Sequence, residues 1–340
     1  MTVTFCADHD PSLKAFVIGH HELAYNDGAS KEDDRPAFVR AASGLSAYRE
    51  YLAVVQDDAN WLALIDADQQ VTAVPLPPSP HGDRVFSASR GNQDDKYDLE
   101  ACVAVEGPEG LELVGFSSGS RRGREYVLRV REKEGSAHHL AGRLVAEFVP
   151  AKAFYEAMRQ RPEFSGSGLN IEGALALEGD TVRLFQRGNA ELCGELEAVD
   201  ATADFSWSEL CSHLSLPDEK PAPELFNIRR YDLGELEGVR LTFSDAEHLG
   251  EGRVLYSASA EVAESGAIMG SVLGVIEAGG AARWTALTDE NGEPFRGKIE
   301  GLTRDLNDSF LIHFVIDEDD ENSASKVYKA RITPNFLERR

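Results

Sequence analysis

Several features that define common protein classes are missing from this chain of 340 residues. It has four cysteines, and no two of them form a CxxC pair, so a structural zinc site has little support. No apolar run approaches the roughly 20 residues that a membrane helix needs. The first ten residues include Asp8, His9 and Asp10, where a secretory signal would be basic and then apolar. We therefore expect a cytoplasmic protein with no membrane partner.

Basic residues are also scarce. Lys and Arg total 34 against 59 Asp and Glu, which gives a formal net charge of −25. Nucleic-acid backbones and anionic membranes are bound by clustered Lys and Arg, so we expect neither as a partner. The excess of acid fits two interpretations, namely general solubility or a local carboxylate cluster that holds a cation.

Sequence motifs of several large enzyme classes are absent. The chain has no Gly-x-Ser-x-Gly elbow, Walker loop, dinucleotide fingerprint or His-Glu-x-x-His. Enzymes that depend on these motifs are disfavoured, no catalytic residue is assigned, and it stays open whether the chain is an enzyme.

A short motif recurs five times: an acidic or small polar residue, then Gly or Ala, usually followed by an apolar residue. The copies are Ser43-Gly44-Leu45, Glu100-Ala101-Cys102, Glu172-Gly173-Ala174, Asp245-Ala246 and Glu300-Gly301-Leu302. Their polar positions are 57, 72, 73 and 55 residues apart. A turn, an apolar strand and a polar loop follow each copy, and further strands bring each unit to three or four. Short strands at this period are typical of propeller blades.

We therefore predict an all-β fold, a β-propeller of five blades in a single domain, with six blades as the alternative. The predicted blades span residues 38–80, 97–150, 169–233, 239–288 and 297–333. The last unit shows only three clear strands, so we expect residues 10–20, and Leu13 to Ile18 in particular, to supply a closing strand. Two stretches with helical apolar spacing, Lys152 to Gln160 and Phe205 to Leu214, are expected about where a fourth strand would lie. Cys102 and Cys193 lie in apolar stretches and are expected in the core.

The repeat predicts a site. In a meander that starts at the centre, the beginning of the first strand and the loop after the second strand share one face. Four acidic motif positions should then surround one mouth of the central channel, together with Ser43. These candidate metal ligands are Glu100, Glu172, Asp245 and Glu300. Facing carboxylates raise one another's pKa unless something compensates them. Ca²⁺ or Mg²⁺, arginines of the surrounding loops, or backbone N–H groups of the next blade would each do so.

The surrounding loops carry candidate ligand-binding residues. Small residues with arginines, as in 117–124, bind phosphate or carboxylate groups, although a solvated hairpin has the same composition. The candidates for a small anionic ligand are Arg121, Arg122, Arg187 and Asn189. The acidic run 317–322 lacks the spacing of an EF-hand, so we expect it to be a solvated loop.

The runs Leu169 to Ala174 and Leu184 to Asn189 resemble the signature of a bacterial family of unknown function. Further matching pieces are Ser43 to Leu45 with Asp57-Asp58, Leu99 to Ala101 with Gly119 to Arg122, Phe243 to Ala246 with Ala260-Glu261, and Lys298 to Gly301. The resemblance implies a propeller-like fold and no established activity. More distantly, the Glu-Gly steps resemble phytase-like and esterase-like propellers, some of which hold calcium in the channel. Ser43, where those favour an acid, departs from that pattern.

Three functions remain in view at this point. The first is a binding protein that holds a divalent cation at the channel mouth and a small anionic ligand beside it. The second is a metal-assisted, phytase-like phosphoesterase, and the third is an interaction scaffold without a small-molecule site. The sequence does not give the oligomeric state.

Overall fold

The computed structural model describes residues 3–107, 110–133, 139–263, 265–318 and 320–339. Within these residues the fold is all-β, and consecutive strands pair as antiparallel meanders. The first sheet comprises β3 (Ala42–Tyr48), β4 (Tyr51–Gln56), β5 (Trp61–Ile65) and β6 (Val71–Pro75). The second sheet comprises β7 (Leu99–Gly107), β8 (Gly110–Ser117), β9 (Tyr126–Glu132) and β10 (Leu144–Pro150). The third comprises β11 (Ile171–Ala176), β12 (Thr181–Gln186), β13 (Asp200–Ser206) and β14 (Phe226–Asp232).

The remaining strands continue this pattern. Next come β16 (Val239–Gly250), β17 (Arg253–Glu261), β18 (Ile268–Ile276) and β19 (Ala282–Thr288), with the short β15 (Glu235–Leu236) beside β16. The last group comprises β20 (Ile299–Arg304), β21 (Leu311–Ile316) and β22 (Lys326–Ile332). The N-terminal strand β2 (Ala15–Glu22) completes it by pairing antiparallel with β22, as the sequence predicted for this part of the chain.

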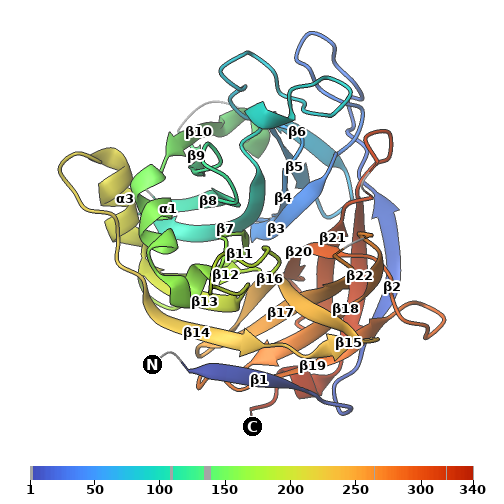
Figure 1. Cartoon of the computed structure of the whole chain (residues 1–340). Coiled ribbons are helices and arrows are strands. Elements are labelled where there is room, and N and C mark those ends of the chain that lie inside the picture. The colour runs from blue at the N-terminus through green and yellow to red at the C-terminus, as the bar shows by residue number, and fades with distance from the viewer. Residues whose placement is uncertain (1–2, 108–109, 134–138, 264, 319, 340) are drawn as a thin grey trace.

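The first strands of these groups lie together at the centre of the molecule (Figure 1). β3 lies against β7, β7 against β11, β11 against β16, β16 against β20, and β20 again against β3. The contacts therefore close on themselves, and the sheets are arranged radially around a common axis.

The hydrophobic core lies between neighbouring sheets rather than in one central mass. Val54 packs toward the last sheet, whereas the next residue, Val55, packs toward the second sheet. Adjacent residues of a strand point to opposite faces, and here a neighbouring sheet covers both faces. This is why the inner strands consist of almost continuously apolar residues.

A strand that the sequence analysis did not expect joins two of the sheets. β1 (Thr4–His9) runs parallel to β14 through one half and parallel to β19 through the other. It therefore connects the outer edges of the third and fourth sheets, and both chain ends lie close to this edge (Figure 1).

The helices differ from the sequence prediction. α1 (Lys152–Arg159) follows the fourth strand β10 instead of replacing it, and α3 (Trp207–Ser215) lies between β13 and β14. The predicted helix at Phe205 was wrong at its start, because β13 extends to Ser206, whose side chain caps α3. The other helical segments are α2 (Pro162–Ser165), η1 (Gln93–Asp95), η2 (Leu140–Arg143) and η3 (Pro334–Phe336). No helix among the described residues has the length and apolarity to cross a bilayer.

The two cysteines expected in the core have different environments. Cys102 is buried between the first two sheets, as predicted. Cys193 is exposed, which corrects the prediction, because its loop contains Glu191, Glu195 and Glu197 and does not join a sheet.

Candidate functional site

The recurring polar residue of the motif lies in a β-bulge. In four of the inner strands the register with the second strand shifts at the motif, so the polar residue has no direct partner across the pair. These bulged residues are Ser43, Glu100, Glu172 and Glu300. A bulge redirects the side chain and bends the strand, which explains why one polar residue is repeated at the start of otherwise apolar strands.

The small residue after the bulge lets the inner strands approach closely. A Cβ added to Gly301 would collide with the backbone of Leu45, and one added to Gly173 would lie 3.0 Å from Asp245 Cα. The same close approach occurs at Gly44, where an added Cβ would lie 3.1 Å from Cys102 N. Glycine is required here for contact between the innermost strands.

Asp245 does not occupy the same position as the three glutamates. In β16 the register shift spans two residues, Ser244 and Asp245, and Asp245 stands where the other strands have Gly or Ala. Its Oδ2 accepts a hydrogen bond from the N–H of Leu302 at 2.8 Å, in the neighbouring strand β20. Burial raises the pKa of this carboxyl well above its usual range. Asp245 therefore connects two inner strands, which is one of the compensations that the sequence analysis considered.

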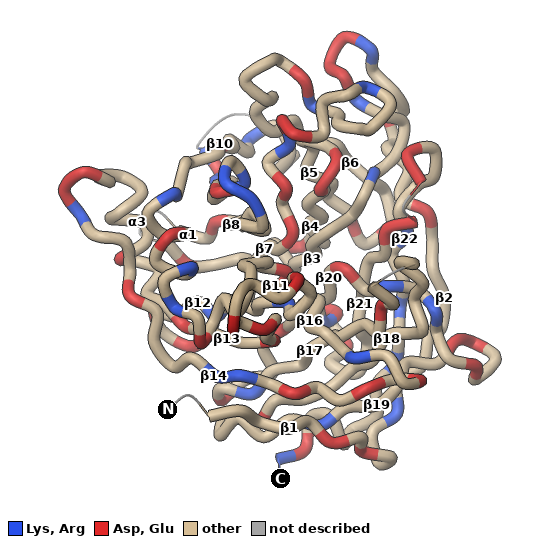
Figure 2. Tube along the Cα trace, viewed as in Figure 1, with Lys and Arg blue, Asp and Glu red and all other residues tan. Residues whose placement is uncertain are grey.

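A pocket of about 430 Å³ opens at the predicted mouth of the channel. Glu100, Glu172, Arg187 and Asn189 line it, as the sequence analysis expected of one face. Asp245 is not among the described residues that line it. Across the molecule, acidic residues are distributed along the whole chain with Lys and Arg between them, so overall charge alone does not mark this mouth (Figure 2).

Glu172 and Glu300 have basic partners. Arg187 Nη1 is 3.3 Å from Glu172 Oε1, and Arg187 also pairs with Glu261. Lys298 Nζ is 2.8 Å from Glu300 Oε1. Burial raises the pKa of Glu300 to about 7, although the Lys298 charge opposes that change.

Glu100 differs from both. Within the described chain, neither a hydrogen bond nor an ion pair reaches its carboxylate. Burial, together with the charges of Asp57 and Glu172, raises the pKa of Glu100 well above its usual range. A half-buried carboxylate among other carboxylates is costly to ionise unless a cation approaches it.

Two further carboxylates converge on Glu100. Asp57, from the loop after β4, and Asp98, just before β7, each place an oxygen within 4.8 Å of the others and of Glu100. Oδ1 of Asp57 is buried without a hydrogen-bond partner. Burial and the Asp98 charge raise the pKa of Asp57 well above its usual value, against the effect of Lys96.

Lys96 compensates part of this negative charge. Its Nζ donates to Asp57, lies 3.2 Å from Asp58 Oδ1 and lies 3.5 Å from Asp98 Oδ1. Burial lowers the pKa of Lys96, but the charges of Asp57 and Asp58 outweigh burial and raise it. Arg124 pairs with Asp98 at 2.7 Å.

The other predicted arginines lie away from the mouth. Arg121 and Arg122 are largely exposed and pair with Asp94 and Glu156, at 3.4 and 3.2 Å. Neither lines the mouth within the described chain. Asn189 does line it, and its side-chain oxygen accepts from Asn170, which also donates to Glu172.

Comparison with known protein families identifies the family of this chain. A model of a family of unknown function, DUF6929, matches residues 38–332. The chain belongs to that family. Among curated proteins, no sequence matches this DUF6929 member significantly.

Solved structures show what the DUF6929 chain is similar to in fold. Virginiamycin B lyase from Staphylococcus aureus is 12% identical over 94% of this chain and 99% of its own, with a TM-score of 0.38. A gluconolactonase from Xanthomonas campestris is 11% identical over 87% and 88%, with a TM-score of 0.39. A GH43 β-1,3-galactosidase is 9% identical over 92% of this chain and 59% of its own, with a TM-score of 0.50. At these identities the likeness concerns the fold alone, and the propeller-like arrangement of this chain rests on the radial packing of its own strands.

The sequence analysis did not assign Asp57, Asp98 or Lys96 to the site. The sequence did contain an indication for Asp57, because this residue lies in the loop after a second strand, and such loops were expected on the same face as the motif residues. Asp98 and Lys96 precede the bulge of β7 and have no counterpart in the repeat, so the pattern alone did not indicate them. Of the acidic run 317–322, Asp319 lies outside the described residues, while Asp320 and Glu321 are exposed.

Proposed function

We propose that this protein is a five-bladed propeller whose channel mouth binds one divalent cation, Ca²⁺ or Mg²⁺, between Asp57, Asp98 and Glu100. The blade count is supported by the closed sequence of contacts β3, β7, β11, β16 and β20 among the described strands. It is also supported by five hydrophobic clusters, each of which joins two neighbouring sheets.

The observation that carries the cation proposal is the unpartnered carboxylate of Glu100 beside two other carboxylates. Two oxygens that bind one Ca²⁺ at about 2.4 Å lie at most about 4.8 Å apart. The three carboxylates meet that limit. Oxygen donors without nitrogen or sulfur favour hard cations such as Ca²⁺ and Mg²⁺.

The charge balance at the mouth favours a cation over an anion. Each basic side chain that lines this pocket in the described chain already has a carboxylate partner. An anionic ligand at Arg187 would have to displace Glu172 or Glu261, whereas a cation would add a partner for Glu100. We therefore propose the cation alone at this mouth.

Thermal unfolding tests the proposal. Protein treated with EDTA should gain several degrees in Tm when Ca²⁺ or Mg²⁺ is added well above its Kd, because a ligand of the native state alone stabilises it. Glu100→Gln should remove that gain. Glu290→Gln, in an exposed turn after β19, is the matched control and should keep it. Equal Tm values with EDTA and with either ion would overturn the proposal.

Lys96 offers a second, independent test. Its ammonium neutralises part of the negative charge of these carboxylates and competes with the ion for them. Lys96→Met should therefore tighten binding of the ion if the proposal holds. If the ammonium is instead the cation that these carboxylates require, Lys96→Met should only destabilise the protein, and no ion should restore it.

All four cysteines are free thiols. Free thiols persist in reducing compartments, so we propose a cytoplasmic location.

A further inference from the structure

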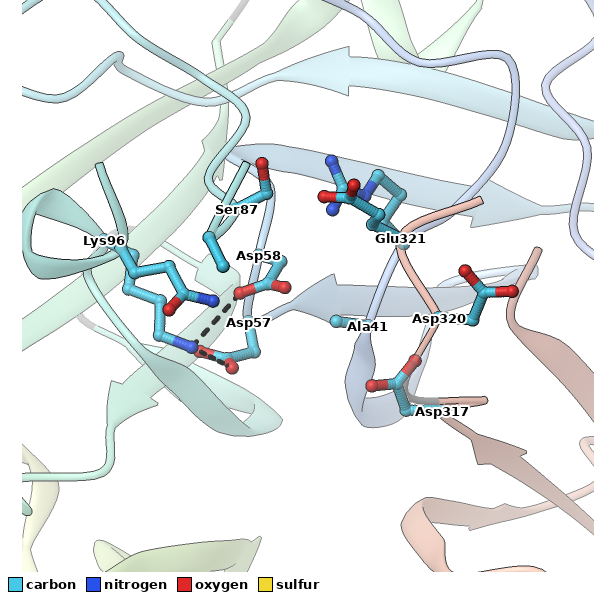
Figure 3. Close-up of a pocket in the computed structure, with 11 residues that line it drawn as sticks. Ala41, Asp57, Asp58, Ser87, Lys96, Asp317, Asp320 and Glu321 are labelled. Carbon is cyan, nitrogen blue, oxygen red and sulfur yellow. Dashed lines mark hydrogen bonds and ion pairs between the residues drawn. The ribbon is translucent and has the colours of Figure 1, made fainter. Parts of the chain in front are cut away.

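A second pocket adjoins the channel mouth and extends beyond the cation site. Its volume is about 410 Å³, and it lies between the loop after β4 and the loop after β21. Figure 3 shows Asp57, Asp58 and Lys96 on one wall, and Ala41 lies between this wall and the other one. The acids of the other wall are Asp317, Asp320 and Glu321. Asp57 and Lys96 belong to both pockets and form the wall that separates them.

Arg40 is the unusual residue of this pocket. It lines the pocket, yet only 8% of its surface is exposed. Its backbone N–H donates to Gln56 Oε1 at 2.8 Å, which fixes the chain at this point. The guanidinium makes one long hydrogen bond, from Nη2 to the carbonyl of Phe86 at 3.4 Å, and Nε is buried without a partner.

No carboxylate of the described chain forms an ion pair with Arg40. Other buried arginines of this protein do have one, as Arg183 has with Asp204 and Arg129 with Glu112. Burying a charged group without a partner is costly, and a guanidinium presents a planar fork that fits a carboxylate. Arg40 therefore has the environment of a residue that receives its anion from a ligand.

The rest of the pocket would repel a purely anionic ligand. Five carboxylates and two cationic side chains, Lys96 and Arg40, line the pocket in the described chain. Lys96 already pairs with both Asp57 and Asp58. Glu321 and Asp320 are exposed, and among the described residues Glu321 accepts one hydrogen bond, from the hydroxyl of Ser89. A ligand that carries an ammonium group opposite its carboxylate would satisfy both walls.

We propose that this pocket binds a small zwitterion in which a carboxylate meets Arg40 and ammonium groups meet the acidic loop after β21. Because acids are in excess, a diamino acid with net positive charge fits better than a neutral amino acid. This ligand site is distinct from the cation site, and the two share only their dividing wall.

Calorimetric titration with four probes tests this assignment. L-Lysine carries both groups and an extra ammonium, L-norleucine lacks the extra ammonium, cadaverine lacks the carboxylate, and glutarate lacks any ammonium. We expect L-lysine to bind most tightly and L-norleucine more weakly. Cadaverine and glutarate should each bind at least about tenfold more weakly than L-lysine, because each loses charge-assisted hydrogen bonds.

Variants of the two walls separate the roles. Arg40→Met should weaken L-lysine by about tenfold or more and bring it level with cadaverine. Arg40→Lys keeps the charge and covers the case in which Arg40→Met does not fold. Asp320→Asn with Glu321→Gln changes only exposed residues and should weaken L-lysine more than L-norleucine, which has one ammonium group fewer. Asp68→Asn, in an exposed turn, is the control and should bind as the wild type does.

Each contrary outcome is decisive. If no probe binds the wild type at millimolar concentration, or if Arg40→Met and Arg40→Lys both bind L-lysine unchanged, the proposal is wrong. A wild-type protein that responds to Ca²⁺ but not to L-lysine would also contradict it. Glu100→Gln should leave L-lysine binding intact, so failure of the cation proposal and failure of this one can be told apart.

Discussion

The repeated acids of this chain have different partners although they come from one sequence motif. Asp245 accepts from a backbone N–H, Glu172 meets Arg187, and Glu300 meets Lys298, while Glu100 has neither kind of partner among the described residues. Copies of one sequence motif therefore serve either contact between strands, as at the displaced Asp245, or charge, as at the three glutamates. The groups that surround each acid determine which of these two roles it has.

Asp245 provides a test of the contact role. Asp245→Ala should destabilise the protein by about 1–3 kcal/mol, because the buried N–H of Leu302 loses its acceptor. Asp245→Asn keeps an acceptor oxygen and removes a carboxyl whose pKa burial raises, so its stability at pH 8 should equal or exceed that of the wild type. Urea unfolding measures both. An Asn variant as unstable as the Ala variant would show that the carboxylate charge is needed.

At single residues, the sequence predicted that Glu100, Glu172, Asp245 and Glu300 share one mouth. Of these four, Glu100 and Glu172 line the same pocket in the described chain, and the charge of Glu300 acts on Glu100. The sequence did not predict the displacement of Asp245, since a two-residue shift in β16 looks like a one-residue motif in the linear sequence. It also missed the burial of Arg40, because Arg40 precedes the first motif copy and lies outside the repeat.

Among the strands, β2 is the one whose position depends most on distant sequence. It is the second strand of the chain, yet it pairs with β22, more than 300 residues later, and also pairs in parallel with β19. Its side chains alternate between the core and solvent, as a strand at the outer edge of a sheet requires.

Two substitutions in adjacent positions of β2 test this closure. Val17 is 4% exposed and Ile18 is 44% exposed. Val17→Asp should cost about 3 kcal/mol or more, or prevent folding, because it buries an unpaired charge between strands. Ile18→Asp should change stability by less than about 0.5 kcal/mol. Chemical unfolding compares them, and equal losses in both variants would mean that β2 does not pair with β22 in this register.

Strand positions were predictable because apolar runs and polar loops alternate regularly. The fourth strands β10 and β14 were not, since many of their residues are half-exposed or exposed and a helix with stronger apolar periodicity lies near each of them in the sequence. β1 was not predicted either, because its side chains are largely exposed and its pairing partners lie more than 200 residues away.

In the whole molecule, the radial arrangement brings many carboxylates to one face, which makes stability depend on pH. Burial raises the pKa of Glu300 to about 7, so the folded state holds this proton more tightly than the unfolded state. The free energy of unfolding contributed by this group therefore falls as pH rises from its ordinary value near 4.5 through 7. Histidines whose pKa burial lowers act in the opposite direction; these are the half-buried His21 and His248 and the buried His313.

The difference between Glu300→Gln and wild type isolates the carboxyl. We expect the variant to gain about 1–3 kcal/mol relative to wild type between pH 5 and pH 8, in urea unfolding without divalent ions. Glu290→Gln should show no such trend. A difference that stays constant with pH, or that reverses, would contradict the raised pKa.

The central claim is that a divalent cation lies among Asp57, Asp98 and Glu100, and anomalous diffraction from crystals soaked in Mn²⁺ tests it most directly. We predict one anomalous peak within coordination distance of all three carboxylates, with Lys96 displaced toward Asp58. An absence of any peak there at millimolar Mn²⁺, with Lys96 still against Asp57, would contradict the account.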